Sequence, residues 1–359
     1  MCTVKTFRLA VLPGDGIGKE VVPPAQDVLQ AVAARYGFAF SFAEFDWSCE
    51  TFKATGRMMP EDGIERLAQH DAIFLGAVGF PGVPDHVSLW GLLIPIRRAF
   101  DQYVNLRPVR LLPGIPCPLA GKQPGDIDFW VVRENTEGEY SQLGGRFTLP
   151  DGDEAVMQTA VFTAKGTDRI LRFAFDLATR LDRPHVTSAT KSNGIYHSMP
   201  FWDERFARMA GAYPAIRTDQ YHIDILTARF VMSPERFDVV VASNLFGDIL
   251  SDLGPGVTGT IAVAPSANIN PERRHPSMFE PVHGSAPDIA GQGIANPIGQ
   301  IWSAAMMLDH LGEPEAGATI LSAIETVLQA PDAPRTPDMG GRSRTAEMGR
   351  AIVEVVRRG

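Results

Sequence analysis

Short apolar runs alternate along the chain with longer stretches of helical periodicity, and this pattern predicts an α/β protein. Strands are predicted where the apolar runs are continuous, at residues 8–12, 72–79, 128–133, 185–189 and 237–242. Helices are predicted where apolar residues recur every three or four positions, at residues 62–70, 91–103, 166–181, 200–210, 246–253, 302–311 and 345–358. The β-branched run at residues 237–242 is typical of a buried strand.

The segments between these elements are predicted to be loops, with one exception. Residues 81–90, 264–269 and 331–341 are expected to be loops, while the polar stretch 141–163 is expected to form a hairpin or arm. Pro108 disfavours helical backbone at Arg107, so the helix predicted at 91–103 should not continue through this pair.

The segment around residues 237–252 is the first candidate site, because it places a predicted strand directly before a predicted helix. Ligands of open α/β sheets bind where strands end and helices begin, and Asn244 is suited to cap the helix. Asp248 and Asp252 are four residues apart and so share one helix face. Two carboxylates that close would suit Mg²⁺ or Mn²⁺, although acidic residues in a first helical turn can also simply complement the helix dipole.

Charged residues at the ends of other predicted elements add candidates. Arg97, Arg107 and Arg133 would fit a small dianion or trianion if the fold brings them together, whereas each alone is typical of a solvated surface. Lys191 follows the predicted strand 185–189; a lysine there is usually solvated, but burial near a cation would lower its pKa and make it a base. Asp224 is a third candidate carboxylate for the metal.

Composition restricts the partners. The formal net charge of −9 argues against nucleic-acid and anionic-membrane surfaces, and no apolar run has the ~20 residues of a membrane span. Three scattered cysteines favour neither a disulfide framework nor a thiolate zinc site, and no histidine pair has zinc-site spacing. The first residues lack a signal-peptide pattern, so we expect a cytoplasmic protein.

Residues 13–18 form a glycine-rich turn after the first predicted strand. The turn resembles a dinucleotide fingerprint, but its third glycine follows Gly16 by two residues instead of three. A tight strand-to-helix turn explains it at least as well as a phosphate site.

Several motifs together resemble one family, the β-decarboxylating dehydrogenases, which act on isopropylmalate, isocitrate, homoisocitrate, tartrate and D-malate. The motifs are LPGDGIG at 12–18, NLR at 105–107, RENTEGEY at 133–140, KSN at 191–193, NLFGDILSD at 244–252 and HGSAPD at 283–288. They occur in order between residues 8 and about 311. The stretches 88–91, 101–105 and 202–205 resemble the tartrate/D-malate branch in particular.

The resemblance implies an α/β fold of the isopropylmalate dehydrogenase type, with two lobes and a large mixed sheet, distinct from the Rossmann fold. It implies a cofactor-binding lobe made of residues 1–107 and 253–359. The second lobe, 108–252, would carry the metal, the substrate, the dimer contacts and an arm near 141–163. The implied partner is a second copy of the chain, in a homodimer with shared active sites.

The resemblance also assigns roles to individual residues. Tyr140 and Lys191 match the catalytic acid and base, and Asp224, Asp248 and Asp252 match the metal ligands. The substrate-binding residues would be Arg97, Arg107, Arg133, Ser88 and Trp90. The cofactor-binding residues would be His283, Gly284, Ser285, Ala286, Asp288, Ile289 and Asn296. The implied cofactors are NAD and Mn²⁺ or Mg²⁺, with K⁺ as a further candidate.

Three functions therefore remain to be compared. The first is NAD-dependent oxidation and β-decarboxylation of D-malate to pyruvate and CO₂, with tartrate as another small 2-hydroxy dicarboxylate substrate. The second is 3-isopropylmalate dehydrogenation, which shares this chemistry and differs at the C3 substituent. Trp90 would fill the space that an isopropyl group needs, unless it packs into the core. The third, an inactive binding protein on the same fold, conflicts with the presence of Tyr140, Lys191 and the three aspartates.

Overall fold

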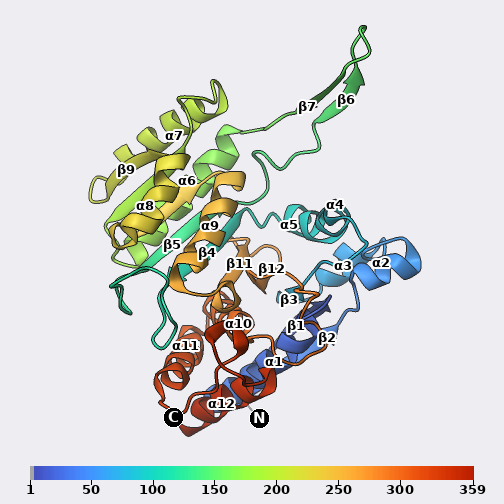
Figure 1. Ribbon diagram of the computed structural model, residues 1–359, viewed down its shortest axis with the longest axis vertical. Coiled ribbons are helices and arrows are strands. Elements are labelled where there is room, and N and C mark those ends of the chain that lie inside the picture. The colour runs from blue at the N-terminus through green and yellow to red at the C-terminus, as the bar shows by residue number, and fades with distance from the viewer. Residues whose placement is uncertain (1–3) are drawn as a thin grey trace.

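A ten-stranded mixed sheet runs through the computed structural model, which describes residues 4–359 (Figure 1). The strand order is β2-β1-β3-β12-β11-β4-β5-β10-β8-β9. β11 is antiparallel to both of its neighbours and β4 is antiparallel to β5, whereas the outer strand pairs are parallel. The strands of this sheet are β1 (Thr6–Gly14), β2 (Ala39–Glu44), β3 (Ala72–Ala77), β4 (Val104–Arg110), β5 (Asp128–Glu134), β8 (His185–Thr190), β9 (Arg217–His222), β10 (Val239–Ala242), β11 (Pro265–Ile269) and β12 (Ser277–Pro281).

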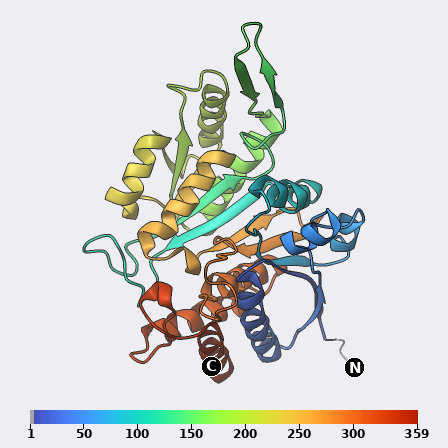
Figure 2. The same cartoon turned by 45° about the vertical axis from the view of Figure 1, so that its right-hand side comes forward.

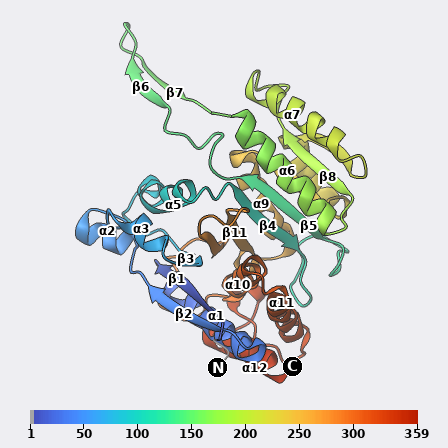
Figure 3. The same ribbon diagram turned by 180° about the vertical axis from the view of Figure 1, so that it is seen from behind.

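Helices cover both faces of the sheet (Figures 1 and 3). The α-helices are α1 (Gly18–Tyr36), α2 (Cys49–Thr55), α3 (Gly63–Leu67), α4 (Asp85–Ser88), α5 (Ile94–Ala99), α6 (Ala164–Arg180), α7 (Ser198–Ala212), α8 (Ile223–Met232), α9 (Asn244–Thr258), α10 (Ile298–Leu311), α11 (Pro314–Gln329) and α12 (Thr345–Arg358). The helices α8 and α9 lie in front of β5, β10 and β8 in Figure 1, and Figure 3 shows α6 and α7 on the opposite face. Within residues 4–359, none of the helices is long and apolar enough to cross a membrane.

A two-stranded arm projects from the second half of the sheet, as Figures 1 and 2 show. It consists of β6 (Gly144–Thr148) and β7 (Glu154–Gln158), which pair only with each other among the described residues. The arm predicted for 141–163 is thus present. Its side chains Phe147, Val156 and Met157 are exposed in the single chain. An isolated two-stranded hairpin is at best marginally stable in water, so packing against a further surface would stabilise this arm.

Three expectations about secondary structure were wrong. Residues 264–269 are not a loop, because β11 occupies the centre of the sheet with all five residues buried. Residues 81–90 contain the helix α4, which continues as a π-helical turn at Leu89–Leu93, so the predicted loop ends early. The predicted helix 91–103 ends at Ala99, and the stretch containing Arg107 is strand β4. Pro108 is tolerated there because β11 pairs with β4 only as far as Leu106.

Candidate active site

Helix α9 carries the two aspartates, and contacts at its first turn fix its position. Ser243, not the predicted Asn244, is the N-cap residue, because Asn244 is already helical. Glu139 closes the N-terminus: its carboxylate accepts hydrogen bonds from the Ser243 hydroxyl (2.7 Å) and the Leu245 backbone N–H (3.0 Å). A Cβ at Gly247 would lie 2.5 Å from the Cβ of Arg133, so glycine lets α9 approach β5 closely.

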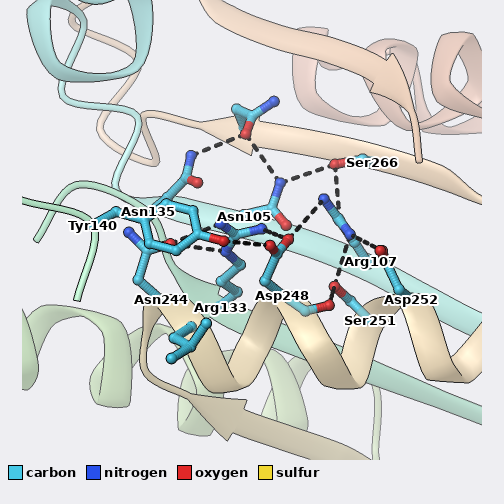
Figure 4. A network of polar contacts seen from close by, with 12 residues as sticks. Asn105, Arg107, Arg133, Asn135, Tyr140, Asn244, Asp248, Ser251, Asp252 and Ser266 are labelled. Carbon is cyan, nitrogen blue, oxygen red and sulfur yellow. Dashed lines mark hydrogen bonds and ion pairs between the residues drawn. The ribbon is translucent and has the colours of Figure 1, made fainter. Parts of the chain in front are cut away.

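The buried guanidinium of Arg133 binds the first turns of α9 from strand β5. Its Nη2 donates to Oδ1 of Asn244 (2.7 Å) and its Nη1 donates to Oδ1 of Asp248. The other carboxylate oxygen of Asp248 accepts a hydrogen bond from the Tyr140 hydroxyl (2.6 Å; Figure 4). Burial lowers the pKa of Arg133 to about 10, so the guanidinium stays charged at neutral pH.

These contacts set the protonation of Tyr140 and Asp248 in opposite directions. Burial and the hydrogen bond to Asp248 raise the pKa of Tyr140 to about 12, so the phenol holds its proton at neutral pH. Burial alone would raise the pKa of Asp248, but the charges of Arg133 and Arg107 outweigh it and lower that pKa below its usual range. A protonated phenol therefore lies against a carboxylate.

Arg107 makes the corresponding contacts one turn further along α9. It donates to Oδ1 of Asp252 (3.0 Å) and to the Ser251 hydroxyl (2.8 Å), while Nη2 lies 3.9 Å from Asp248. Burial raises the pKa of Asp252, and the charge of Arg107 only partly offsets this. The aspartates are thus paired with the predicted substrate arginines, and a metal ion would have to displace these ion pairs.

A buried polar network extends from this cluster across the centre of the sheet. Asn105 donates to Ser266 (2.9 Å) and to Asn268 (3.0 Å), and Asn268 donates to Glu280 (2.7 Å). Glu280 accepts a hydrogen bond from Arg97 (2.9 Å), which brings the third arginine into the same network.

Sequence reasoning missed Ser266, Asn268 and Glu280. The available signal was the alternation of small polar residues at 266 and 268, which places both on one face of a strand.

Lys191 and Asp224 form a separate pair. Nζ of Lys191 lies 2.9 Å from Oδ1 of Asp224, and the Asp224 side chain is 67% exposed. Within residues 4–359 neither side chain shares a hydrogen bond or ion pair with Tyr140, Asp248 or Asp252, and no group of three His, Cys, Asp or Glu residues is assembled for a metal. One chain therefore brings together only part of the predicted site.

Ser88 and Trp90 lie at the transition from α4 to the π-helical turn. Ser88 is buried and its hydroxyl donates to the Asp85 carbonyl (2.9 Å). Trp90 is half-buried, and the guanidinium of Arg98 lies 5.1 Å from its ring centroid. Arg98 also donates to the backbone carbonyl of Tyr140 (2.9 Å), which places Trp90 beside the catalytic candidate instead of in the core.

The predicted cofactor loop packs against the glycine-rich turn. The Ser285 carbonyl accepts from the Ile17 N–H (2.9 Å), and a Cβ at Gly16 would lie 2.1 Å from that oxygen. The turn is therefore a support for this loop, and its glycine is required by the close approach. Ala286 has a left-handed backbone (φ 39°), while Gly284 and Asp288 are exposed.

The two polar residues Asn296 and His283 of the predicted cofactor site differ in their hydrogen bonding. Asn296 is fully engaged, because it donates to Asp338 (3.0 Å) and accepts from the Ile298 N–H (3.0 Å) at the start of α10. Nε2 of His283 is buried and has no hydrogen-bond partner within residues 4–359, so it is available to a ligand. Ile289 packs with Ile17 and Val21 under the loop.

Comparison with known proteins identifies the family. The family model described as "Isocitrate/isopropylmalate dehydrogenase" matches residues 8–352. The chain belongs to this family. It is therefore an oxidoreductase, a decarboxylating dehydrogenase, with the α/β fold and mixed sheet that the motifs imply.

Curated relatives narrow the resemblance further. The chain is 63% identical to a "D-malate dehydrogenase [decarboxylating]" of Escherichia coli (strain K12), covering 99% of this chain and 100% of the relative. It is 58% identical to a "Tartrate dehydrogenase/decarboxylase" of Pseudomonas putida, covering 98% of both. A crystal structure of isocitrate dehydrogenase from Methylococcus capsulatus is 35% identical and superposes with a TM-score of 0.88, covering 98% of this chain and 99% of the other.

Proposed function

We propose that the chain oxidises D-malate with NAD and a divalent metal ion and releases pyruvate and CO₂, with tartrate as an additional substrate. The observation that carries this proposal is the 63% identity, over essentially the whole of both chains, to a D-malate dehydrogenase. The arginine–carboxylate cluster supports it, because Arg97, Arg107 and Arg133 converge where a small dicarboxylate would need two bidentate partners.

The metal and the cofactor have suitable donors. Asp248 and Asp252 offer carboxylate oxygens, the ligands that Mg²⁺ and Mn²⁺ prefer, and Asp224 of a second copy would complete the set. His283 offers an unsatisfied buried nitrogen to NAD, and a hollow of about 390 Å³ beside Gly16, Gly79 and Pro287 adjoins the loop 283–288. When bound, the metal would polarise the C2 oxygen of the substrate, and NAD would accept the hydride. K⁺ is retained as a candidate cofactor from the family resemblance alone.

The chain's own groups then supply binding and proton transfer. The arginines would hold the two carboxylates, and Lys191 would accept the C2 hydroxyl proton. After loss of the carboxylate on C3, Tyr140 would protonate the enolate carbon. Its raised pKa, about 12, suits a group that must still be protonated when that step occurs.

We further propose a cytoplasmic homodimer with two lobes in each subunit, 1–107 with 253–359, and 108–252. The sheet order supports this division, because β1, β2, β3, β11 and β12 form one half of the sheet and β5, β8, β9 and β10 lie in the other. The exposed apolar arm supports association with a second copy.

The reaction assay tests the proposed function. We expect NADH formation from D-malate with Mn²⁺, complete loss in excess chelator, and recovery when Mn²⁺ is restored. With 3-isopropylmalate, kcat/KM should be lower than with D-malate by at least about 10-fold, since each misfit methylene changes binding by ~1–3 kcal/mol. Full activity in chelator would refute the metal assignment, and a higher kcat/KM for 3-isopropylmalate would assign the chain to that activity instead.

The cofactor preference provides a separate prediction. We expect kcat/KM to be more than about 10-fold higher with NAD than with NADP, equivalent to about 1.4 kcal/mol, because the Asp288 carboxylate would repel a 2′-phosphate. In Asp288→Asn the ratio should fall towards one, while Asp27→Asn, which alters an equally exposed aspartate on α1, should leave it unchanged. An unchanged ratio in Asp288→Asn would remove this role from Asp288.

A further inference from the structure

A hollow of about 520 Å³ with a basic lining lies where strands β1, β3 and β12 begin. Its lining includes four cationic side chains and a single carboxylate, that of Asp71. The cations are Lys5, Arg8, Arg273 and Arg274, and His310 also lines the hollow. We call these residues the basic hollow.

The basic hollow and the active site lie at opposite ends of the strands β1, β3 and β12. The strands β1, β3 and β12 run parallel, and their first residues are at the hollow. Their last residues lead to the turn 13–18 and the loop 283–288. Even the five residues of β12 span roughly 17 Å, so a ligand in the hollow cannot be the substrate or the nicotinamide cofactor.

Two of the four cationic side chains in the basic hollow have no anionic partner among residues 4–359. Lys5 pairs with Glu313 (2.7 Å) and Arg8 lies 3.8 Å from Asp71. Neither Arg273 nor Arg274 forms an ion pair or a side-chain hydrogen bond within the described part of the chain. In a protein with a formal net charge of −9, two adjacent unpaired arginines in a concave site are an unusual concentration of positive charge.

Local structure holds these arginines in place. Arg273 has a left-handed backbone (φ 54°), an uncommon conformation for a residue other than glycine. Asn270 maintains it: its carbonyl accepts from the Arg273 N–H (3.0 Å) and its side chain accepts from the Arg274 N–H (2.9 Å). Strained backbone that neighbouring contacts enforce is a feature of binding sites.

His310 adds a neutral donor to the same wall. Its ring packs against Phe279, with 5.7 Å between the ring centroids. Burial and the charge of Arg273 lower the pKa of His310 to about 4, so the imidazole is neutral at physiological pH. A neutral imidazole beside two guanidiniums can donate one hydrogen bond to an oxyanion without adding charge.

We propose that the basic hollow binds a small, multiply charged phosphate anion of the pyrophosphate or polyphosphate-ester class. Arginine forks match phosphate oxygens in bidentate fashion, and a volume of about 520 Å³ lies within the range of small-molecule sites. The loop that presents Arg273 and Arg274 joins β11 to β12, the strands that carry Ser266, Asn268 and Glu280. An anion in the hollow would therefore bind the distal end of the hairpin that supports the substrate arginines.

Calorimetric titration with pyrophosphate, without metal or substrate and at constant ionic strength, tests the proposal. We expect saturable binding to the wild-type chain, and a Kd at least about 10-fold higher in the double variant Arg273→Ala/Arg274→Ala. The matched control is Arg357→Ala/Arg358→Ala, which removes two adjacent exposed arginines at the end of α12 and should leave the Kd unchanged. If the first double variant does not fold, Arg274→Gln carries the same comparison.

The outcomes are distinct and do not depend on turnover. No saturable binding, or the same Kd in all three proteins, would overturn the proposal, because the anion would then bind elsewhere or through overall charge. Competition with ATP identifies the source of the phosphate: displacement indicates a nucleoside polyphosphate, and its absence indicates pyrophosphate or a smaller ester. Since no catalysis is measured, failure here leaves the proposed dehydrogenase function intact, and the reverse also holds.

Discussion

Two inactive variants, Tyr140→Phe and Lys191→Ala, should regain activity when they are unfolded and refolded together. We expect about a quarter of the wild-type sites to return. The structure motivates this experiment, because within residues 4–359 the Lys191–Asp224 pair shares no hydrogen bond or ion pair with the Tyr140–Asp248 cluster. In the proposed homodimer, the two clusters of a complete site would come from different copies.

The expected yield follows from symmetry. Random pairing makes half of the dimers mixed, and a two-fold dimer with shared sites then has one site with both defects and one with neither. Half of the sites in half of the dimers gives one quarter. If each site were built within a single subunit, every site would keep one defect and no activity would return.

A matched mixture excludes nonspecific rescue. Tyr140→Phe refolded with Asp252→Asn combines two defects from the same cluster, so every site of a mixed dimer should still carry one of them. This mixture should stay at the level of the separate variants when it is assayed at a metal concentration that leaves Asp252→Asn inactive. Recovery in both mixtures, or in neither despite proven mixed dimers, would contradict shared sites.

The sequence predicted those strands and helices whose own residues show a clear apolar pattern. Strand β10 is a β-branched run, strand β5 contains the apolar stretch 129–132, and helices α6 and α12 have a strong apolar face, so these local patterns identified them. Strand β11 was missed because Ser266 and Asn268 are polar yet buried. Their burial depends on Asn105, more than 150 positions away in the chain, and periodicity carries no information about such a partner.

The candidate site was likewise predicted only where local sequence patterns or motifs identify its residues. Spacing alone placed Asp248 and Asp252 on one helix face, the position of Arg133 at the end of a predicted strand made it a candidate, and the motifs added Tyr140. Sequence could not show that each aspartate pairs with one of the proposed substrate-binding arginines, because those pairs join β4 and β5 to α9 through tertiary packing. Nor could it show that Lys191 and Asp224 lie apart from them in one chain.

These pairings predict that Asp248→Asn and Asp252→Asn differ in stability although both impair metal-dependent activity. Each variant should need a sharply higher Mn²⁺ concentration, since each loses a proposed ligand charge. Only Asp248→Asn removes the charged partner of Arg133, whose side chain is 3% exposed. Breaking a buried ion pair costs about 3–5 kcal/mol of unfolding free energy. We expect a cost at the lower end of this range, because the Asp248 side chain is still 33% exposed. Asp252 is 58% exposed, so its loss should cost less than about 1 kcal/mol.

Denaturant unfolding of the three proteins without metal measures this difference directly, and its pH dependence adds an internal check. Because the folded pKa of Asp248 is lowered, its stabilising contribution is present above the unfolded pKa, about 3.9, and is lost as the pH falls through the folded value. The wild type should therefore lose its advantage over Asp248→Asn on acidification. Partial burial raises the folded pKa of Asp252 instead of lowering it, so the wild type should show no such acid-dependent loss of stability relative to Asp252→Asn. Equal unfolding free energies for the two variants at pH 7 would show that the buried Arg133 does not need the Asp248 carboxylate, and that its hydrogen bonds to the Asn244 amide oxygen are sufficient.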